Sequence, residues 1–116
     1  MIKQKIADLE EYGDTSFLIK KLYKGERSEA VLINLRPGQE VPPHSHDRFE
    51  VVLLPQKGQG LLTVQGEEPV RLDPGTVYYQ PAGCRFGVAN SSEGSFQMAI
   101  IDLANPAART SLFAPA

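Results

Sequence analysis

Glycine and proline divide this chain into short segments, and this feature limits its fold more than any other. Ten Gly and nine Pro are spread along the 116 residues rather than gathered in one tail. Both residues interrupt regular structure, so frequent turns are expected and long helices are not. Strands at a spacing of roughly 8–12 residues, with turn signals between them, are typical of an all-β sandwich or barrel.

The segments between these turns are predicted to be strands. Residues 5–12 form either one short helix or an irregular lead-in, and no later segment of helical length has a 3.6-residue apolar period. The apolar run at 49–54 is predicted to be a central strand, whereas Pro42 and Pro43 favour an edge or bulged position for 41–46. The predicted strands cover residues 16–23, 29–35, 41–46, 49–54, 61–64, 70–72, 76–80, 86–89 and 96–103.

Size and charge narrow the class of protein. A chain of 116 residues is expected to form one domain, spanning residues 1–116. The net charge of -2 and the scattered Lys and Arg argue against a nucleic-acid-binding surface, and the apolar stretches are too short to cross a bilayer. The N-terminus has no long apolar segment, so no secretory signal is expected. With a single cysteine, Cys84, no intrachain disulfide can form, and the cytoplasm is the expected compartment.

Three candidate metal ligands lie close together in the sequence. His44, His46 and Glu50 are separated by even numbers of residues, and both histidines of the chain belong to this stretch. In a continuous strand, residues at i, i+2 and i+6 face the same side. Two imidazoles and one carboxylate suit Fe, Mn, Ni or Zn. The alternative is that two exposed histidines in a proline-rich loop bind nothing.

A second stretch has a spacing that pairs with the first. Gly75, Pro81, Gly83 and Asn90 occur at intervals that by themselves indicate only strand, turn and strand. Together the two stretches resemble the cupin family. Its first motif matches over residues 38–58, through Gly38, His44, His46 and Glu50, with the final glycine displaced by one to Gly58. Its second motif matches over residues 75–90. The resemblance implies a double-stranded β-helix, the jelly-roll cupin barrel.

One position departs from the family pattern. The second motif normally supplies a further metal-binding histidine, and this chain has Phe86 there. The resemblance therefore carries over only His44, His46 and Glu50 as metal ligands. Either these three still hold a divalent transition metal (Fe, Mn, Ni or Zn), or the barrel has become an apolar pocket. Cys84 and Asp47 lie at odd spacing from the motif positions and are not expected to replace the lost ligand.

Four further residues are predicted to line the pocket: Phe86, Arg48, Tyr78 and Met98. Arg48 shares parity with His46 and Glu50, so it could clamp a substrate carboxylate, although a surface salt bridge would use it equally well. Tyr78 and its neighbour Tyr79 should face opposite sides of a regular strand, and one of them could offer a phenolic donor. Met98 is expected to belong to the core.

The sequence leaves two functions open. Cupin resemblance implies a metal-dependent enzyme acting on a small organic molecule, as a dioxygenase, isomerase, decarboxylase or lyase. The alternative is a non-catalytic module that binds a small ligand and has lost its metal, which Phe86 favours because it makes the pocket more apolar. The resemblance also implies a homodimer. Neither nucleic acid nor a membrane is expected as a partner.

Overall fold

The fold consists almost entirely of short strands. The computed structural model describes residues 1–45 and 48–104. Within them it contains one short 3-10 helix, η1 (Ile6–Leu9), and nine strands. The strands are β1 (Leu18–Lys24), β2 (Ser28–Leu35), β3 (Glu40–Ser45), β4 (Phe49–Lys57), β5 (Gly60–Val64), β6 (Val70–Leu72), β7 (Tyr78–Gln80), β8 (Arg85–Ala89) and β9 (Phe96–Ala104). No helix in the described part of the chain is long and apolar enough to cross a membrane.

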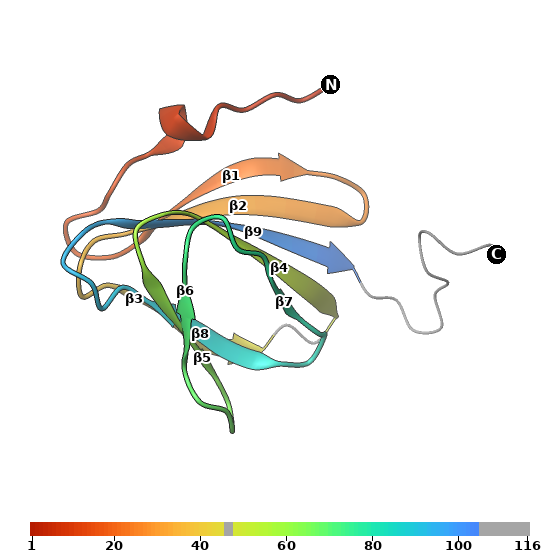
Figure 1. Ribbon diagram of the computed structural model, residues 1–116. Coiled ribbons are helices and arrows are strands. Elements are labelled where there is room, and N and C mark those ends of the chain that lie inside the picture. Colours follow the sequence, from red (N-terminus) through yellow and green to blue (C-terminus); the bar gives the residue numbers. More distant parts are fainter. Residues whose placement is uncertain (46–47, 105–116) are drawn as a thin grey trace.

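The strands form two antiparallel sheets that face each other (Figure 1). One sheet has the order β1-β2-β9-β4-β7 and the other has the order β3-β8-β5-β6. The predicted all-β jelly roll is therefore confirmed. So is the internal position of β4, which pairs with β9 on one side and β7 on the other. β3 is an edge strand with a register shift between Val41 and His44, as its two prolines indicated.

The core fills the space between the sheets. Along β4, Val51 and Leu53 are fully buried while their neighbours are partly exposed, because successive side chains point to opposite faces of a strand. Burying one such side chain contributes about 1.5–3 kcal/mol relative to leaving it in water. The buried core comprises Ile33, Leu35, Val51, Leu53, Leu62, Val64, Leu72, Phe86, Val88, Phe96 and Met98.

A turn after β4 shows why the displaced motif glycine still serves the fold. Gly58 adopts a positive φ of 78°. Any β-carbon at this position would collide with the backbone carbonyl oxygen of Ser95. Glycine is the residue that adopts this backbone conformation without strain and leaves room for so close an approach. The turn therefore needs Gly58 although the spacing to Glu50 is one residue longer than in the family motif.

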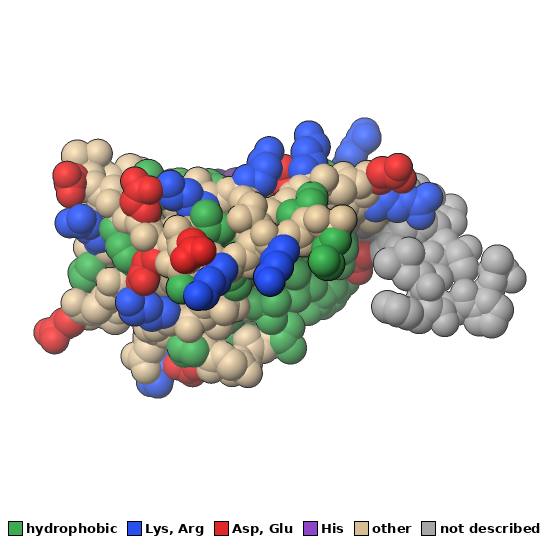
Figure 2. Space-filling view, turned by 90° about the horizontal axis from the view of Figure 1, so that it is seen from above, with side chains coloured by type: hydrophobic (Ala, Val, Ile, Leu, Met, Phe, Trp, Pro, Cys, Tyr) green, Lys and Arg blue, Asp and Glu red, His purple; other side chains and the backbone are tan. Residues whose placement is uncertain are grey.

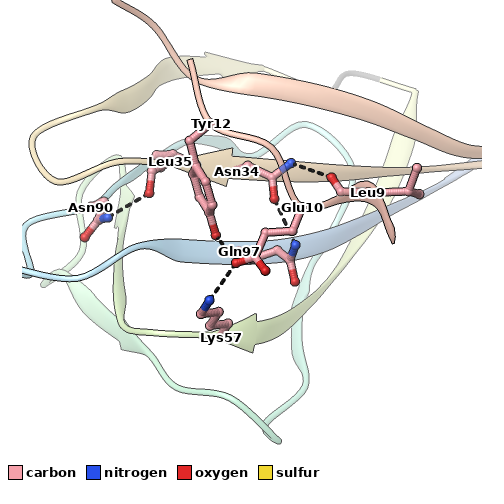
Figure 3. Close-up of polar contacts among 8 residues, drawn as sticks. All are labelled: Leu9, Glu10, Tyr12, Asn34, Leu35, Lys57, Asn90 and Gln97. Carbon is pink, nitrogen blue, oxygen red and sulfur yellow. Dashed lines mark hydrogen bonds and ion pairs between the residues drawn. The ribbon is translucent and has the colours of Figure 1, made fainter. Parts of the chain in front are cut away.

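The N-terminal segment packs over the outer face of the five-stranded sheet (Figure 1). Asn34 of β2 and Gln97 of β9 are buried there, and Gln97 donates a 2.9 Å hydrogen bond to Asn34. Asn34 in turn donates to the carbonyl oxygen of Leu9 (Figure 3). Next to them, Glu10 accepts hydrogen bonds from Lys57 and Tyr12, each at 2.6 Å. These contacts hold the N-terminal segment against the sheet, because buried amides must find partners.

The surface on this side is mixed in character. Figure 2 views the molecule from above relative to Figure 1, and acidic side chains lie among the basic ones on the face that it shows. Hydrophobic side chains gather in one area between them. This mixture agrees with the scattered charges of the sequence.

We predict that Tyr12 titrates unusually late. Burial, together with its hydrogen bond to Glu10, raises the pKa of Tyr12 to about 12. Because this folded-state pKa exceeds the ordinary value of 10.0, the stabilisation is complete below pH 10.0 and is lost as the pH rises toward 12. The ultraviolet difference titration between the parent and Tyr12→Phe should therefore show one phenol with a midpoint near 12. A midpoint at the ordinary value would contradict the packing of this segment.

We predict that Asn90, the last residue of the second motif, is needed for stability rather than for chemistry. Its side chain is buried and donates to the carbonyl oxygens of Leu35 and Gly94, while its Oδ1 accepts from Ser92. Asn90→Ala should lower the free energy of unfolding by about 2 kcal/mol, because buried carbonyl groups lose their donors. Denaturant unfolding measures this loss. Ser91→Ala, an exposed change in the same loop, is the control and should have an effect within about 0.5 kcal/mol.

Candidate functional site

A small cavity opens between the two sheets and has a volume of about 180 Å³. Strands β1, β2 and β9 of one sheet and β3 and β8 of the other contribute to its wall. Most of the lining is apolar and includes Ile33, Val88, Ile100 and Phe86. A larger hollow of about 380 Å³ lies between the N-terminal segment and β1, but none of the described histidines or carboxylates lines it. The smaller cavity is therefore the candidate site.

Two ionisable side chains line this cavity among the described residues: His44 and Asp102. They come from opposite sheets, His44 from β3 and Asp102 from β9. A mostly apolar pocket with a few polar groups is the usual form of a small-molecule site. The arrangement therefore gives this cavity both a surface for an apolar ligand and groups that can recognise a polar one.

His44 is positioned by the irregular edge of the four-stranded sheet. It pairs in register with Phe86 of β8, and their ring centroids are 6.0 Å apart at an interplanar angle of 34°. Phe86 is only 3% exposed, whereas His44 is exposed. The imidazole therefore lies on the solvent side of the Phe86 ring.

A backbone contact fixes which nitrogen of His44 can accept a proton or a ligand. Its Nδ1 lies 2.9 Å from the carbonyl oxygen of Pro42. Because a carbonyl oxygen only accepts hydrogen bonds, Nδ1 is the donor. In the neutral ring the lone pair is then on Nε2. Histidines that bind metals commonly have their other nitrogen held in this way.

Asp102 is a site residue that the sequence interpretation missed. In register it lies between Glu29 of β2 and Val51 of β4. Since Val51 belongs to the core, Asp102 lies on the inner face of its sheet, and its Oδ1 is fully buried. The signal was present in the sequence, because Asp102 has the same parity as Met98, which was expected in the core. A carboxylate on a core face marks a functional candidate.

Glu50 does not share a strand with His44. β3 ends at Ser45 and β4 begins at Phe49 in the other sheet, so the premise of one continuous strand over residues 44–50 is wrong. Glu50 alternates with the core residue Val51 and therefore faces outward. There it accepts a 2.5 Å hydrogen bond from Tyr79, which is 54% exposed.

The three predicted metal ligands are therefore not all brought together in the described residues. His46 and the neighbouring Asp47 lie outside the described residues. Within residues 1–45 and 48–104, no group of three His, Cys, Asp or Glu side chains could hold a metal ion. Among the described residues, two possible metal ligands line the same cavity: His44 and Asp102. The assignment of His44, His46 and Glu50 to a metal stays a prediction.

The four predicted pocket residues have different positions. Phe86 lines the cavity beside His44. Met98 is fully buried in the core. Tyr78 packs against the core, and its hydroxyl donates to the carbonyl oxygen of Arg71 and accepts from the amide of Asp73. These two hydrogen bonds stabilise the turn between β6 and β7.

Arg48 and Cys84 contribute nothing to the cavity wall. Arg48 is exposed in the turn before β4, and Cys84 is half-buried in the turn before β8. The prediction that Arg48 faces inward assumed one strand over residues 44–50, and the change of sheet removes that assumption. Tyr78 and Tyr79 do face opposite sides of β7, as expected.

Comparisons with solved structures identify similar folds. A protein from Thermus thermophilus superimposes with a TM-score of 0.84 and is 27% identical, covering 91% of this chain and 100% of that chain. An uncharacterised Klebsiella pneumoniae protein with a double-stranded β-helix domain gives 0.82 at 16% identity, covering 89% of this chain and 84% of that one. The DMSP lyase DddQ from Ruegeria pomeroyi gives 0.69 at 19% identity, covering 83% of this chain and 50% of that one. The last two show the fold alone.

The sequence itself identifies the family. No similar sequence is found among curated proteins. The family model for the cupin domain matches residues 31–102, which include both motif stretches from His44 to Asn90 and extend to Asp102. This match covers more than half of the chain and agrees with the two-sheet architecture. The chain therefore belongs to the cupin family.

Proposed function

We propose that this cupin binds a small organic molecule in the cavity between its two sheets, with His44 at the mouth of the cavity and Phe86 in its wall. The observation that carries this proposal is an apolar cavity lined by two ionisable groups, His44 and Asp102. A carboxylate with one buried oxygen in an otherwise apolar wall favours a role in recognition, because burying a charged group costs free energy unless it is paired.

The size of the cavity limits the ligand. An apolar cavity of about 150 Å³ accommodates benzene. At about 180 Å³, this cavity suits a molecule of one ring or a short branched chain. For a ligand of this size, an affinity on the order of 1 mM is expected.

The position of Phe86 supports binding without a metal. It occupies the place of the family's second-motif histidine and is directly opposite His44 in the β3–β8 ladder. A phenyl ring there offers an apolar surface for a ligand where a histidine would offer a coordinating nitrogen. The DMSP lyase among the similar structures is an enzyme on this fold. A fold shared by many functions leaves binding and catalysis both available to this chain.

We predict that filling the cavity weakens ligand binding. Val31 lines the cavity from β2, so Val31→Phe should occupy the space of a single-ring ligand and weaken its binding by at least about tenfold. A panel of single-ring compounds, followed by chemical-shift titration of the amide groups, measures the effect. Val52→Phe makes the same change on the outer face of β4 and should leave binding unchanged. If no compound of the panel shifts the cavity amides of the parent, the proposal fails.

A second candidate function is metal-dependent catalysis on a small organic molecule. The observation that favours it is the contact between Nδ1 of His44 and the Pro42 carbonyl, which leaves Nε2 as the coordinating atom. His44, His46 and Glu50 would hold a divalent transition metal (Fe, Mn, Ni or Zn), for which Glu50 would have to leave Tyr79 and turn inward. A bound metal would polarise a substrate oxygen or activate dioxygen.

Metal analysis separates the two candidates. In the proposed binding module, Phe86→His should raise the affinity for Zn²⁺ or Mn²⁺ by at least about tenfold, because it adds an imidazole opposite His44. Equilibrium dialysis against the free ion measures this gain, and Phe86→Leu is the control that adds no ligand. Elemental analysis of the untagged parent decides between the candidates. Near-stoichiometric metal that is absent from His44→Ala would replace the binding module with the metal enzyme.

A further inference from the structure

We infer that the ligand of this cavity has an apolar chain that leaves through the gap between β1 and β3, and that Ile19 at this gap selects for the length of the chain. This inference rests on the proposed function, because it assumes that the cavity between the sheets is the binding site. It names the class of ligand more closely, as a small ring that carries a short alkyl chain. It also assigns a role to an exposed residue outside both motif stretches.

In the five-stranded sheet, a row of apolar side chains leads from the core to the edge strand. Met98, Ile33 and Ile19 are aligned across β9, β2 and β1. Met98 and Ile33 are buried, whereas Ile19 is 53% exposed. Ile33 and Ile19 both line the cavity. The apolar surface of this wall therefore continues from the buried part of the cavity into solvent.

The four-stranded sheet has a matching row on the opposite wall. Leu62, Val88 and Val41 are aligned across β5, β8 and β3. Leu62 and Val88 are buried, and Val41 at the edge is half-buried. Val88 and Val41 both line the cavity. In both sheets, burial thus decreases toward the edge strand while the side chains stay apolar.

The mouth of the cavity lies where these two rows end. β1 and β3 are the edge strands of their sheets, and Ile19 and Val41 line the cavity from them. Covering an exposed isoleucine removes apolar surface from water and is favourable. An apolar mouth that is continuous with an apolar cavity therefore favours a ligand with an apolar part at both places.

The size of the cavity determines which part of the ligand reaches the mouth. An apolar cavity of about 150 Å³ accommodates benzene, and this cavity has a volume of about 180 Å³. A ring with about one further carbon atom fills it. Any longer chain on the ring has to leave through the mouth, where Ile19 lies on one side and Val41 on the other.

The apolar part of the mouth is short. Two positions after Ile19 on the same face of β1 is Lys21, which is opposite the cavity residue Val31 in register. Its side chain is 60% exposed, and its Nζ lies 3.3 Å from Oε2 of Glu29. A charged pair therefore follows directly after the isoleucine. This arrangement favours a chain of about two to three carbon atoms over a longer one, because methylene groups beyond Ile19 stay in water.

A series of alkylbenzenes tests this inference. Toluene, ethylbenzene, propylbenzene and butylbenzene are compared by equilibrium dialysis at one low free concentration, where the ratio of bound ligand gives the ratio of affinities. A fully buried methylene contributes about 0.8 kcal/mol, and a partly covered one contributes less. Propylbenzene should therefore bind the parent at least about fourfold more tightly than toluene, and butylbenzene should add less than about twofold to that.

Substitutions of Ile19 show whether this residue causes the gain. In Ile19→Ser the ratio of propylbenzene to toluene affinity should fall below about twofold, because the exposed part of the chain loses its apolar contact. Ile19→Val keeps an apolar, β-branched side chain and should retain most of the ratio. If the ratio is unchanged in Ile19→Ser, the assignment to Ile19 is overturned.

Val77→Ser is the matched control. Val77 is 64% exposed and lies outside the wall of the cavity, so this variant also replaces one exposed aliphatic side chain by serine. It should keep the ratio of the parent. An equal fall in Val77→Ser and Ile19→Ser would mean that the alkyl chain contacts the surface without selectivity, which also overturns the inference.

The same series separates this inference from the proposed function. If toluene binds the parent and the longer ligands bind no more tightly, the binding function stands and the chain assignment fails. If none of the four ligands binds, the proposed function fails, and the assignment to Ile19 falls with it. Amide chemical shifts locate the bound chain. A propylbenzene chain that shifts residues of the hollow between the N-terminal segment and β1, rather than Ile19 and Val41, would overturn the inference.

Discussion

Strand β9 is the element on which both the core and the candidate site depend. It lies in the middle of the five-stranded sheet, between β2 and β4 (Figure 1). Its inner face begins with Phe96 and Met98, which are fully buried, and continues with Ile100 and Asp102 at the cavity. One strand thus passes from closed core to open pocket. β9 pairs with β2 on one side and β4 on the other, so hydrogen bonds fix its register and hold its backbone in place.

The close packing at one end of β9 and the cavity at the other end have different causes. At the closed end, Gly60 has no side chain, and a β-carbon there would collide with the ring of Phe96. The glycine allows the aromatic ring to fill the space between the sheets. At the other end, the edge strand β3 is irregular between Val41 and His44, so that its prolines interrupt the ladder. The cavity lies beside this irregular edge, with Val41 and His44 in its wall.

The sequence predicted the positions of the strands better than the directions in which their side chains point. Gly and Pro located the turns, and the expected strands at 29–35, 61–64 and 70–72 agree with β2, β5 and β6 within one residue. The expectation that Glu50 faces the same side as His44 failed, because side chains alternate regularly only within one strand. The chain changes sheets between Ser45 and Phe49. The predicted strands at 41–46 and 49–54 left a break here, but periodicity does not show that the second strand lies in the other sheet. Tertiary arrangement, rather than local propensity, decides where Glu50 points.

Asp102 was missed for a different reason. In the last strand Met98 was expected in the core, but the same parity was not followed as far as Asp102 near the end of the strand. A residue that breaks the pattern of a buried face is expected at functional sites, where local rules give way to recognition.

The family motifs of this chain are explained more fully by the fold than by metal chemistry. Gly58 and Asn90 serve a tight turn and a buried hydrogen-bond network, and both roles are independent of any bound ion. Both residues therefore keep these roles in the fold whatever residue occupies position 86. Phe86 is packed into the core and contacts the ring of His44, so it is an integral part of the barrel interior. In this chain the framework holds an apolar wall beside a histidine and a carboxylate.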